Sequence, residues 1–274
     1  MMTRWAVILL LVVISNLGGC NASVMSKDMN PKKHFEDEKV IALAKATVSG
    51  DVKTIDRLVS EGVDVNYRGR KNITPLLWSV GKPDKAGMRR LLEHGASPNI
   101  LTDDGDSFIG FVAASPDTDY LKMALEYGGN PNLRNNLEET VLFSAATANH
   151  ENVEESIRFL IEYGADINAV DYSGTNAAMA AAGINQFRSA FFLIKKGIDY
   201  KQKNQWGNSI VYVLERNRLG FFPGSEKYDF RTRIAAFLEE RGIEVDLKTP
   251  PDAPENWLEL SYDAINAQLP ERYR

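Results

Sequence analysis

A six-residue segment built around a glycine recurs along the chain, and this repetition constrains the fold more than any other feature. The first copy reads Glu61-Gly62-Val63-Asp64-Val65-Asn66. The glycines of all the copies are Gly62, Gly95, Gly128, Gly164, Gly197 and Gly242, separated by 33, 33, 36, 33 and 45 residues. Such a period predicts a row of similar supersecondary units, each of which is stabilised by its neighbours.

Each unit is expected to contain two helices. An amphipathic stretch, such as residues 55–61 or 157–163, precedes the glycine, and glycine ends a helix well because it adopts left-handed backbone at little cost. A shorter helix of small and apolar residues is expected after the segment, for example over residues 107–114, 140–148 and 175–182. Side chains suited to cap these shorter helices are Thr74, Ser107, Thr140, Thr175 and Asn208.

The sequence Thr74-Pro75-Leu76, together with the period of 33, resembles the ankyrin repeat, although Leu77 replaces the histidine that follows in that family. The resemblance covers residues 37–246. It implies an all-α fold, an ankyrin-repeat solenoid of about six helix-turn-helix repeats with short hairpin turns. The two longer spacings predict insertions near residues 149–154 and 219–228.

The first nineteen residues have the layout of a secretory signal, with Arg4, an apolar run over residues 5–14 and small residues before the single cysteine. Leu17-Gly18-Gly19-Cys20 resembles the lipobox of bacterial lipoproteins, which implies lipid attachment at Cys20 through acyl chains such as palmitate. By the same resemblance, Asn21 implies an outer-membrane destination facing the periplasm. The alternative is a soluble periplasmic protein with one spare thiol. Residues 20–36 are polar and are expected to form a flexible tether.

The C-terminal end of the chain changes in composition. Residues 247–254 are rich in proline and cannot continue the repeats. Apolar residues then recur at helical spacing over 257–269, so residues 247–274 are expected to cap the last repeat. The inserted pair Phe221-Phe222 either folds back as part of this cap, which we favour, or contacts a partner.

Neither catalysis nor cofactor binding is expected from this sequence. His34, His94 and His150 lie far apart, without the spacing of metal ligands, and His94 is expected to sit at a helix C-terminus. The run from Asp103 to Asp106 departs from the ligand spacing of a calcium loop and is interpreted as a hairpin turn. The net charge of −5 argues against nucleic acid as a partner.

The hairpin tips are the candidate partner-binding positions, because ankyrin proteins bind partners along these tips and on the concave face. Tyrosine, tryptophan and arginine most often carry interface energy, and the mixed charges of the tips favour a protein partner. The candidate residues are Tyr67, Arg68, Arg70, Asp103, Asp104, Arg134, Asn135, Asp171, Tyr172, Gln205 and Trp206.

Two functions remain open for such a protein-binding lipoprotein. Exported ankyrin-repeat lipoproteins resemble immunity proteins that neutralise secreted antibacterial toxins, notably phospholipase effectors of the type VI secretion system. The alternative is a housekeeping periplasmic scaffold that organises or protects an envelope enzyme. An immunity gene is expected beside a toxin gene, whereas a scaffold gene is not.

Overall fold

The computed structural model describes residues 30–216 and 224–247, which divide into two compact units at the junction of Asp166 and Ile167. In the described ranges the regular elements are all helical. The first unit contains Pro31–Lys33 (η2), Glu38–Ser49 (α3), Val52–Ser60 (α4), Arg70–Asn72 (η3), Pro75–Trp78 (α5), Ser79–Gly81 (η4), Lys85–Glu93 (α6), Phe108–Ala113 (α7), Thr118–Glu126 (α8), Val141–Thr147 (α9) and Val153–Glu162 (α10). The second unit contains Ala177–Gly183 (α11), Phe187–Lys195 (α12), Ile210–Arg216 (α13) and Glu226–Glu239 (α14).

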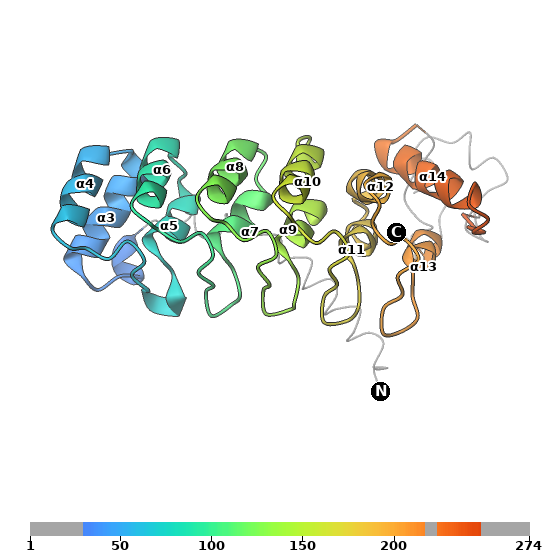
Figure 1. Ribbon diagram of the computed structural model, residues 1–274, viewed down its shortest axis with the longest axis horizontal. Coiled ribbons are helices and arrows are strands. Elements are labelled where there is room, and N and C mark those ends of the chain that lie inside the picture. The colour runs from blue at the N-terminus through green and yellow to red at the C-terminus, as the bar shows by residue number, and fades with distance from the viewer. Residues whose placement is uncertain (1–29, 217–223, 248–274) are drawn as a thin grey trace, which may run out of the picture. The chain divides into compact units, whose positions relative to one another are not determined.

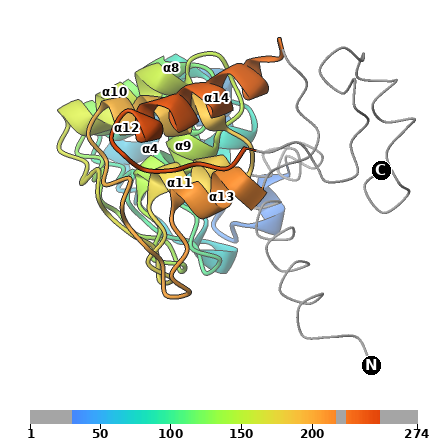
Figure 2. The same ribbon diagram turned by 90° about the vertical axis from the view of Figure 1, so that its right-hand side faces the viewer.

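The helices come in antiparallel pairs, four in the first unit and two in the described part of the second, which confirms the predicted helix-turn-helix repeats. Within the first unit the pairs stand in a row, with their hairpins projecting to one side (Figure 1). In the second unit α11 packs beside α13, and α12 packs beside α14 (Figure 2). The inner helices pack closely because small residues such as Ala145, Ala178 and Ala181 are fully buried.

The repeat glycines have the predicted role. Gly62, Gly128 and Gly164 adopt φ angles of 85°, 85° and 88°, directly after the residue that caps an outer helix. The longer third spacing is also explained, because α9, the connection at residues 148–152 and α10 are each one residue longer than α7, residues 114–117 and α8. The three extra residues thus lie between the start of α9 and the end of α10 and leave the hairpin spacing unchanged.

The helix caps were predicted correctly in part. Thr74 and Ser107 cap α5 and α7 through their hydroxyl groups, and Thr140 holds the corresponding position before α9 without a side-chain hydrogen bond. The prediction of Thr175 was wrong, because Asn176 caps α11 by accepting a hydrogen bond from the Met179 amide. Asn208 was likewise placed one residue too early, since it lies two residues before α13 begins.

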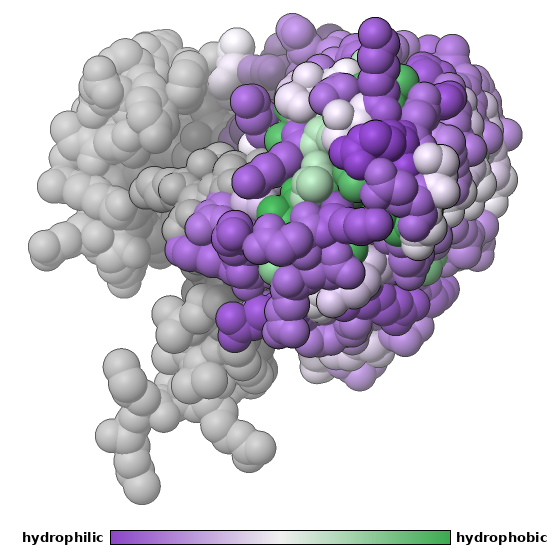
Figure 3. Space-filling view, turned by 90° about the vertical axis from the view of Figure 1, so that its left-hand side faces the viewer, coloured by the Kyte–Doolittle hydropathy of each residue, from purple (hydrophilic) through white to green (hydrophobic). Residues whose placement is uncertain are grey.

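The N-terminal boundary of the folded part also differs from the prediction. Residues 30–36 were assigned to a flexible tether, but Pro31–Lys33 form a 3₁₀ turn and Phe35 is buried. Phe35 packs edge-on against Tyr67 and Trp78, with ring centroids 6.4 Å apart in both pairs. Seen from the α3–α4 end, the first unit presents mainly hydrophilic side chains around a small apolar patch (Figure 3). Because Phe35 is buried in this way, residues 30–36 belong to the folded first repeat.

The asparagine that ends each of the first three repeated segments joins one repeat to the next. Its side-chain amide donates a hydrogen bond of 2.8–2.9 Å to the glycine carbonyl of the following segment, and its side-chain oxygen accepts one of 2.7–2.8 Å from the amide two residues beyond that glycine. The bonds join Asn66 to Gly95 and Ser97, Asn99 to Gly128 and Asn130, and Asn132 to Gly164 and Asp166.

This role predicts a measurable cost for removing one asparagine. Asn99→Ala is expected to lower the free energy of unfolding by about 1–2 kcal/mol, because two intramolecular hydrogen bonds are lost while water still reaches the groups left behind. Asn149→Ala, in the exposed connection between α9 and α10, is the matched control and should change stability little. Urea unfolding monitored by circular dichroism measures both, and equal midpoints would remove the asparagine link as a source of stability.

A charged cluster further joins the outer helices of the first two repeats. Arg90 on α6 donates to Asp56 on α4, with 2.9 Å between Nη2 and Oδ2, and His94 Nε2 lies 2.7 Å from Asp56 Oδ1. The hydrogen bonds from Arg90 and His94 lower the pKa of Asp56 to about 2. His94 caps the C-terminus of α6, where the sequence placed it, and also reaches the preceding repeat.

Several predicted features lie outside the described residues. These are the signal segment, Cys20, the Phe221-Phe222 pair and the C-terminal segment 257–269. In the described ranges no helix combines the length and apolar character needed to cross a membrane.

Candidate protein-binding surface

The hairpin tips are held in shape by one side chain at the start of each turn. In three hairpins an Asn or Asp oxygen accepts hydrogen bonds from the backbone amides two and four residues later, at 2.8–3.1 Å. These side chains are Asn135, Asp171 and Asn204. Asn135 and Asp171 were predicted as partner contacts, and the structure gives both a role inside their own hairpins. Because these turns are closed by hydrogen bonds, the backbone of the neighbouring tip residues has little freedom to move.

The first two hairpins are tied to each other at their tips. Lys71 Nζ lies 2.9 Å from Asp104 Oδ2, and Asn72 donates to Asp103 Oδ1 at 2.6 Å. The hydrogen bond that Lys71 donates to the Asp104 carboxylate raises the pKa of Lys71. The predicted turn at residues 103–105 is observed, with Gly105 at φ 88°. Asp103 and Asp104 were both predicted to contact a partner. In the structure their side chains bind the neighbouring hairpin instead.

The remaining predicted residues of the first unit differ in exposure. Tyr67 is half-buried because its ring packs on Phe35, so little of it is available to a partner. Arg68 and Arg70 are exposed on the first hairpin. Arg134 is exposed and donates to the carbonyl of Glu138 across its own turn.

The second unit carries the most prominent side chains of the predicted set. Tyr172 and Trp206 are 65% and 63% exposed, more than any other large hydrophobic side chain in the described residues. They lie on neighbouring hairpins, which are joined by a 2.8 Å hydrogen bond from the Gln205 amide to the Ser173 carbonyl. The structure thus brings Tyr172, Gln205 and Trp206 onto two linked tips.

Sequence reasoning overlooked one tip residue. Leu137 is 41% exposed at the tip of the third hairpin, nine residues after Gly128, and Trp206 stands nine residues after Gly197. The ranking by residue type passed over it because leucine is rare among residues that dominate binding. Comparing equal positions between repeats is the signal that identifies it.

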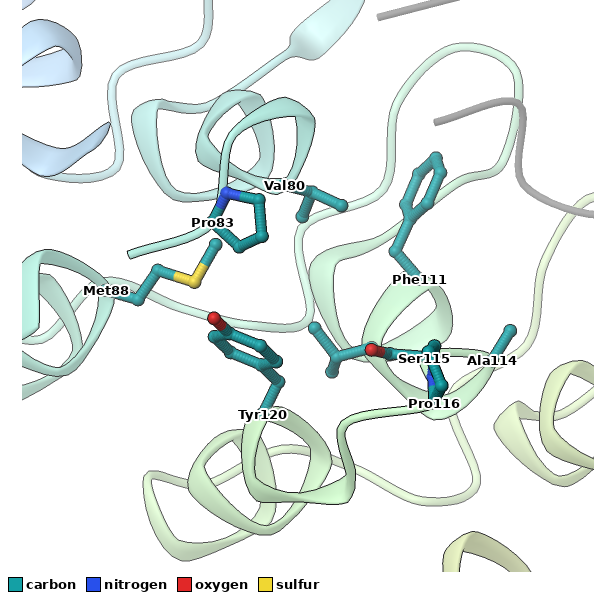
Figure 4. Close-up of a pocket in the computed structure, with 9 residues that line it drawn as sticks. Val80, Pro83, Met88, Phe111, Ala114, Ser115, Pro116 and Tyr120 are labelled. Carbon is teal, nitrogen blue, oxygen red and sulfur yellow. The ribbon is translucent and has the colours of Figure 1, made fainter. Parts of the chain in front are cut away.

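A cavity of about 210 Å³ lies between the second and third helix pairs of the first unit (Figure 4). Apolar side chains form most of its wall, including Met88 and Phe111, and the ring of Tyr120 closes one side. None of its nine lining residues carries a carboxylate, an imidazole or a thiol. The cavity has room for an apolar group but offers no acid–base pair for chemistry.

The repeat geometry agrees with the comparison to protein families. Residues 109–204 match the family model for ankyrin repeats in three copies. These three units are ankyrin repeats. A sequence relative is the palmitoyltransferase AKR1 of Lachancea kluyveri, 25% identical over 201 residues that make up 71% of this chain and 27% of the relative. The chain therefore spans about a quarter of that relative's length.

Solved structures share the fold. An ankyrin repeat domain from Acinetobacter baumannii is 21% identical, with a TM-score of 0.60 over 74% of this chain and 98% of that one. A chain from the complex of the predatory endopeptidase Bd0816 of Bdellovibrio bacteriovorus with immunity protein Bd3460 is 21% identical, with a TM-score of 0.56 over 70% of this chain and 97% of that one.

The predicted ankyrin-repeat fold is thereby confirmed, and with it the coarse function. Ankyrin repeats bind protein partners through the surface that their hairpins and inner helices present. The exposed tips of this chain, rather than a catalytic cleft, are accordingly its candidate functional site.

Proposed function

We propose that this protein is a lipid-anchored, protein-binding component of the bacterial envelope and acts as an immunity protein against a secreted antibacterial toxin, specifically a phospholipase effector. The observation that carries the proposal is the pair of exposed aromatic side chains, Tyr172 and Trp206, on two linked hairpin tips. Water-exposed rings in closed turns contribute little to the core and are suited to bury themselves in a partner.

Two further observations support the immunity role. The signal-like segment that ends at Cys20 would bring the repeats to the compartment where secreted toxins act on envelope lipids. The fold is also similar to that of a chain from a complex between an endopeptidase and an immunity protein. An inhibitor of this kind needs rigid recognition and no catalytic group, and the closed hairpins suit that need.

The lipid anchor is tested apart from the toxin. Growth of the source bacterium with labelled palmitate is expected to label the full-length chain, and Cys20→Ser should abolish the label because the acylated thiol is gone. Membrane fractionation of both forms completes the measurement. A label that persists in the Cys20→Ser variant would exclude this attachment site.

The immunity role is tested with the full-length chain, tagged at its C-terminus and recovered from the envelope of the source bacterium. The expected result is a stoichiometric complex with a secreted lipase, whose hydrolysis of phospholipid vesicles falls to background at equal molar amounts. A lipase that remains fully active in excess of this protein would refute the proposal. Recovery of an endogenous envelope enzyme, protected by the complex, would instead support the scaffold.

A further inference from the structure

The structure points to the chemistry of the partner: we propose that the fourth and fifth hairpins dock an acidic segment that carries an apolar side chain. The docking surface, called here the Tyr–Trp surface, consists of Tyr172, Lys201, Lys203, Gln205 and Trp206, all within the second unit. The inference rests on the proposed protein-binding function and adds to it the class of partner segment.

The apolar half of the surface follows from exposure. Tyr172 and Trp206 are each more than 60% exposed, whereas the other exposed large hydrophobic side chains of the described residues reach only 40–43%. Trp206 lies at a hairpin tip, where its ring does not pack in the core. Burial of this ring by a partner removes a large apolar area from water. The occupant should therefore present an aliphatic or aromatic side chain to the two rings.

The two hairpins are fixed to one another before any partner arrives. Besides the backbone bond between Gln205 and Ser173, the Gln202 side chain donates to the Gly174 carbonyl at 3.0 Å. Gly174 lies so close to the fifth hairpin that a Cβ there would stand 3.3 Å from the Asn204 Cα. Binding to such a surface loses little conformational entropy, which favours tight complexes.

The charged half of the surface is basic. Lys201 and Lys203 are exposed on the fifth hairpin, and from Tyr200 to Leu214 the sequence contains no acidic residue. Of the carboxylates in the sequence of the two hairpins, Asp199 accepts a hydrogen bond from the Lys201 amide, and Asp171 accepts hydrogen bonds from the amides of its own turn. In a chain of net charge −5, this arrangement favours a partner segment with carboxylates beside its apolar side chain.

The second hairpin shows the opposite pattern and sharpens the inference. It carries three aspartates, Asp103, Asp104 and Asp106, and it lies in the first unit. An acidic segment is repelled there and attracted at the Tyr–Trp surface. The first hairpin also carries exposed basic side chains, Arg68 and Arg70, so the two exposed rings and the lysines together, and not charge alone, distinguish the Tyr–Trp surface.

A phage-displayed library of random dodecapeptides, selected on the full-length chain in detergent, tests the proposal. Enriched peptides should combine Asp or Glu with an aromatic or aliphatic residue. Trp206→Ala and Tyr172→Ala should each weaken binding of an enriched peptide about thirtyfold, the factor that corresponds to about 2 kcal/mol at 1.4 kcal/mol per tenfold. Tyr163→Ala, which removes an exposed ring from the first unit, is the control and should bind normally.

The charge requirement is tested with a double reversal. Lys201→Glu combined with Lys203→Glu should weaken the same peptide about tenfold, and the loss should shrink at high salt. Lys45→Glu with Lys122→Glu changes the net charge equally at exposed positions of the first unit and should leave binding unchanged. Circular dichroism verifies that every variant is folded.

Basic or uncharged enriched peptides, or equal binding by the Trp206→Ala variant, would overturn the inference. The outcome is separable from the proposed immunity function. A toxin that is neutralised equally well by the Trp206→Ala and Tyr172→Ala variants would leave the immunity role standing and remove the Tyr–Trp surface. If acidic peptides were enriched but no toxin were inhibited, the Tyr–Trp surface would stand and the immunity role would fall.

Discussion

Replacing Gly87 by alanine is expected to destabilise the first unit by about 3 kcal/mol, although alanine is the better helix former. Gly87 is buried in α6, where that helix crosses α3. A Cβ at this position would stand 2.0 Å from the carbonyl oxygen of Thr47 and 2.8 Å from its carbonyl carbon. These are backbone atoms in the last turn of α3, at a fully buried residue, so the clash is relieved only by separating the two helices.

Urea unfolding monitored by far-ultraviolet circular dichroism measures this cost. Gly183→Ala is the matched control, because Gly183 ends the inner helix α11 and a Cβ there would meet no atom within 4 Å. Its stability should stay equal or rise by up to about 1 kcal/mol, as helix propensity requires. If Gly87→Ala instead gained stability as the control does, the close approach of α3 and α6 would be refuted.

The Gly87 contact illustrates what sequence periodicity does not reveal. The helix before Gly95 was expected from its amphipathic pattern, but a glycine within it counts only as a weak helix former. The need for a missing side chain arises from Thr47 in the preceding repeat, forty residues away. Contacts between repeats depend on where two helices cross, and the hydrophobic pattern of one repeat does not show where that is.

The repeats themselves were predictable because their signals are local. Gly62, Gly128 and Gly164 end their helices with positive φ angles, as a glycine at that point of each period predicts. The cap of α11 shows the limit of the same reasoning. Thr175 and Asn176 are both able to cap a helix, and the choice falls to Asn176, whose amide also donates to the Asp199 carbonyl of the next repeat.

The candidate site was predictable as a set of positions and less so as a set of contacts. Alignment of the repeats places Tyr172 and Trp206 at hairpin tips, and the structure finds both exposed. The same alignment also placed Asn135 and Asp171 there, but their side chains close their own turns. Whether a polar tip side chain faces a partner or its own backbone depends on turn geometry, whereas a large ring at a tip has no such internal use.

Replacing Phe35 by alanine is expected to lower the stability of the first repeat by about 3–5 kcal/mol, the usual cost of deleting a buried phenylalanine ring. Phe35 is 1% exposed and belongs to one apolar cluster with Val40, Ile41 and Trp78. The ring also supports the first hairpin, because Gly69 packs so tightly on it that an added Cβ would lie 2.8 Å from Phe35 Cδ1.

The loss should appear first in the repeat that contains Phe35, since each repeat is stabilised by its own packing and by its immediate neighbours. Hydrogen exchange should therefore accelerate in α3 and α4 of the Phe35→Ala variant, while α9 and α10 keep their protection. Phe35→Leu, which retains most of the apolar volume, is the matched control and should cost less than about 1.5 kcal/mol. Unchanged exchange in α3 would mean that residues 30–36 form a tether, as their polar composition indicates, and that the fold begins at Asp37. Accelerated exchange would place the start of the folded domain at Pro31, eleven residues after Cys20, and so shorten the segment that separates the repeats from the proposed lipid anchor.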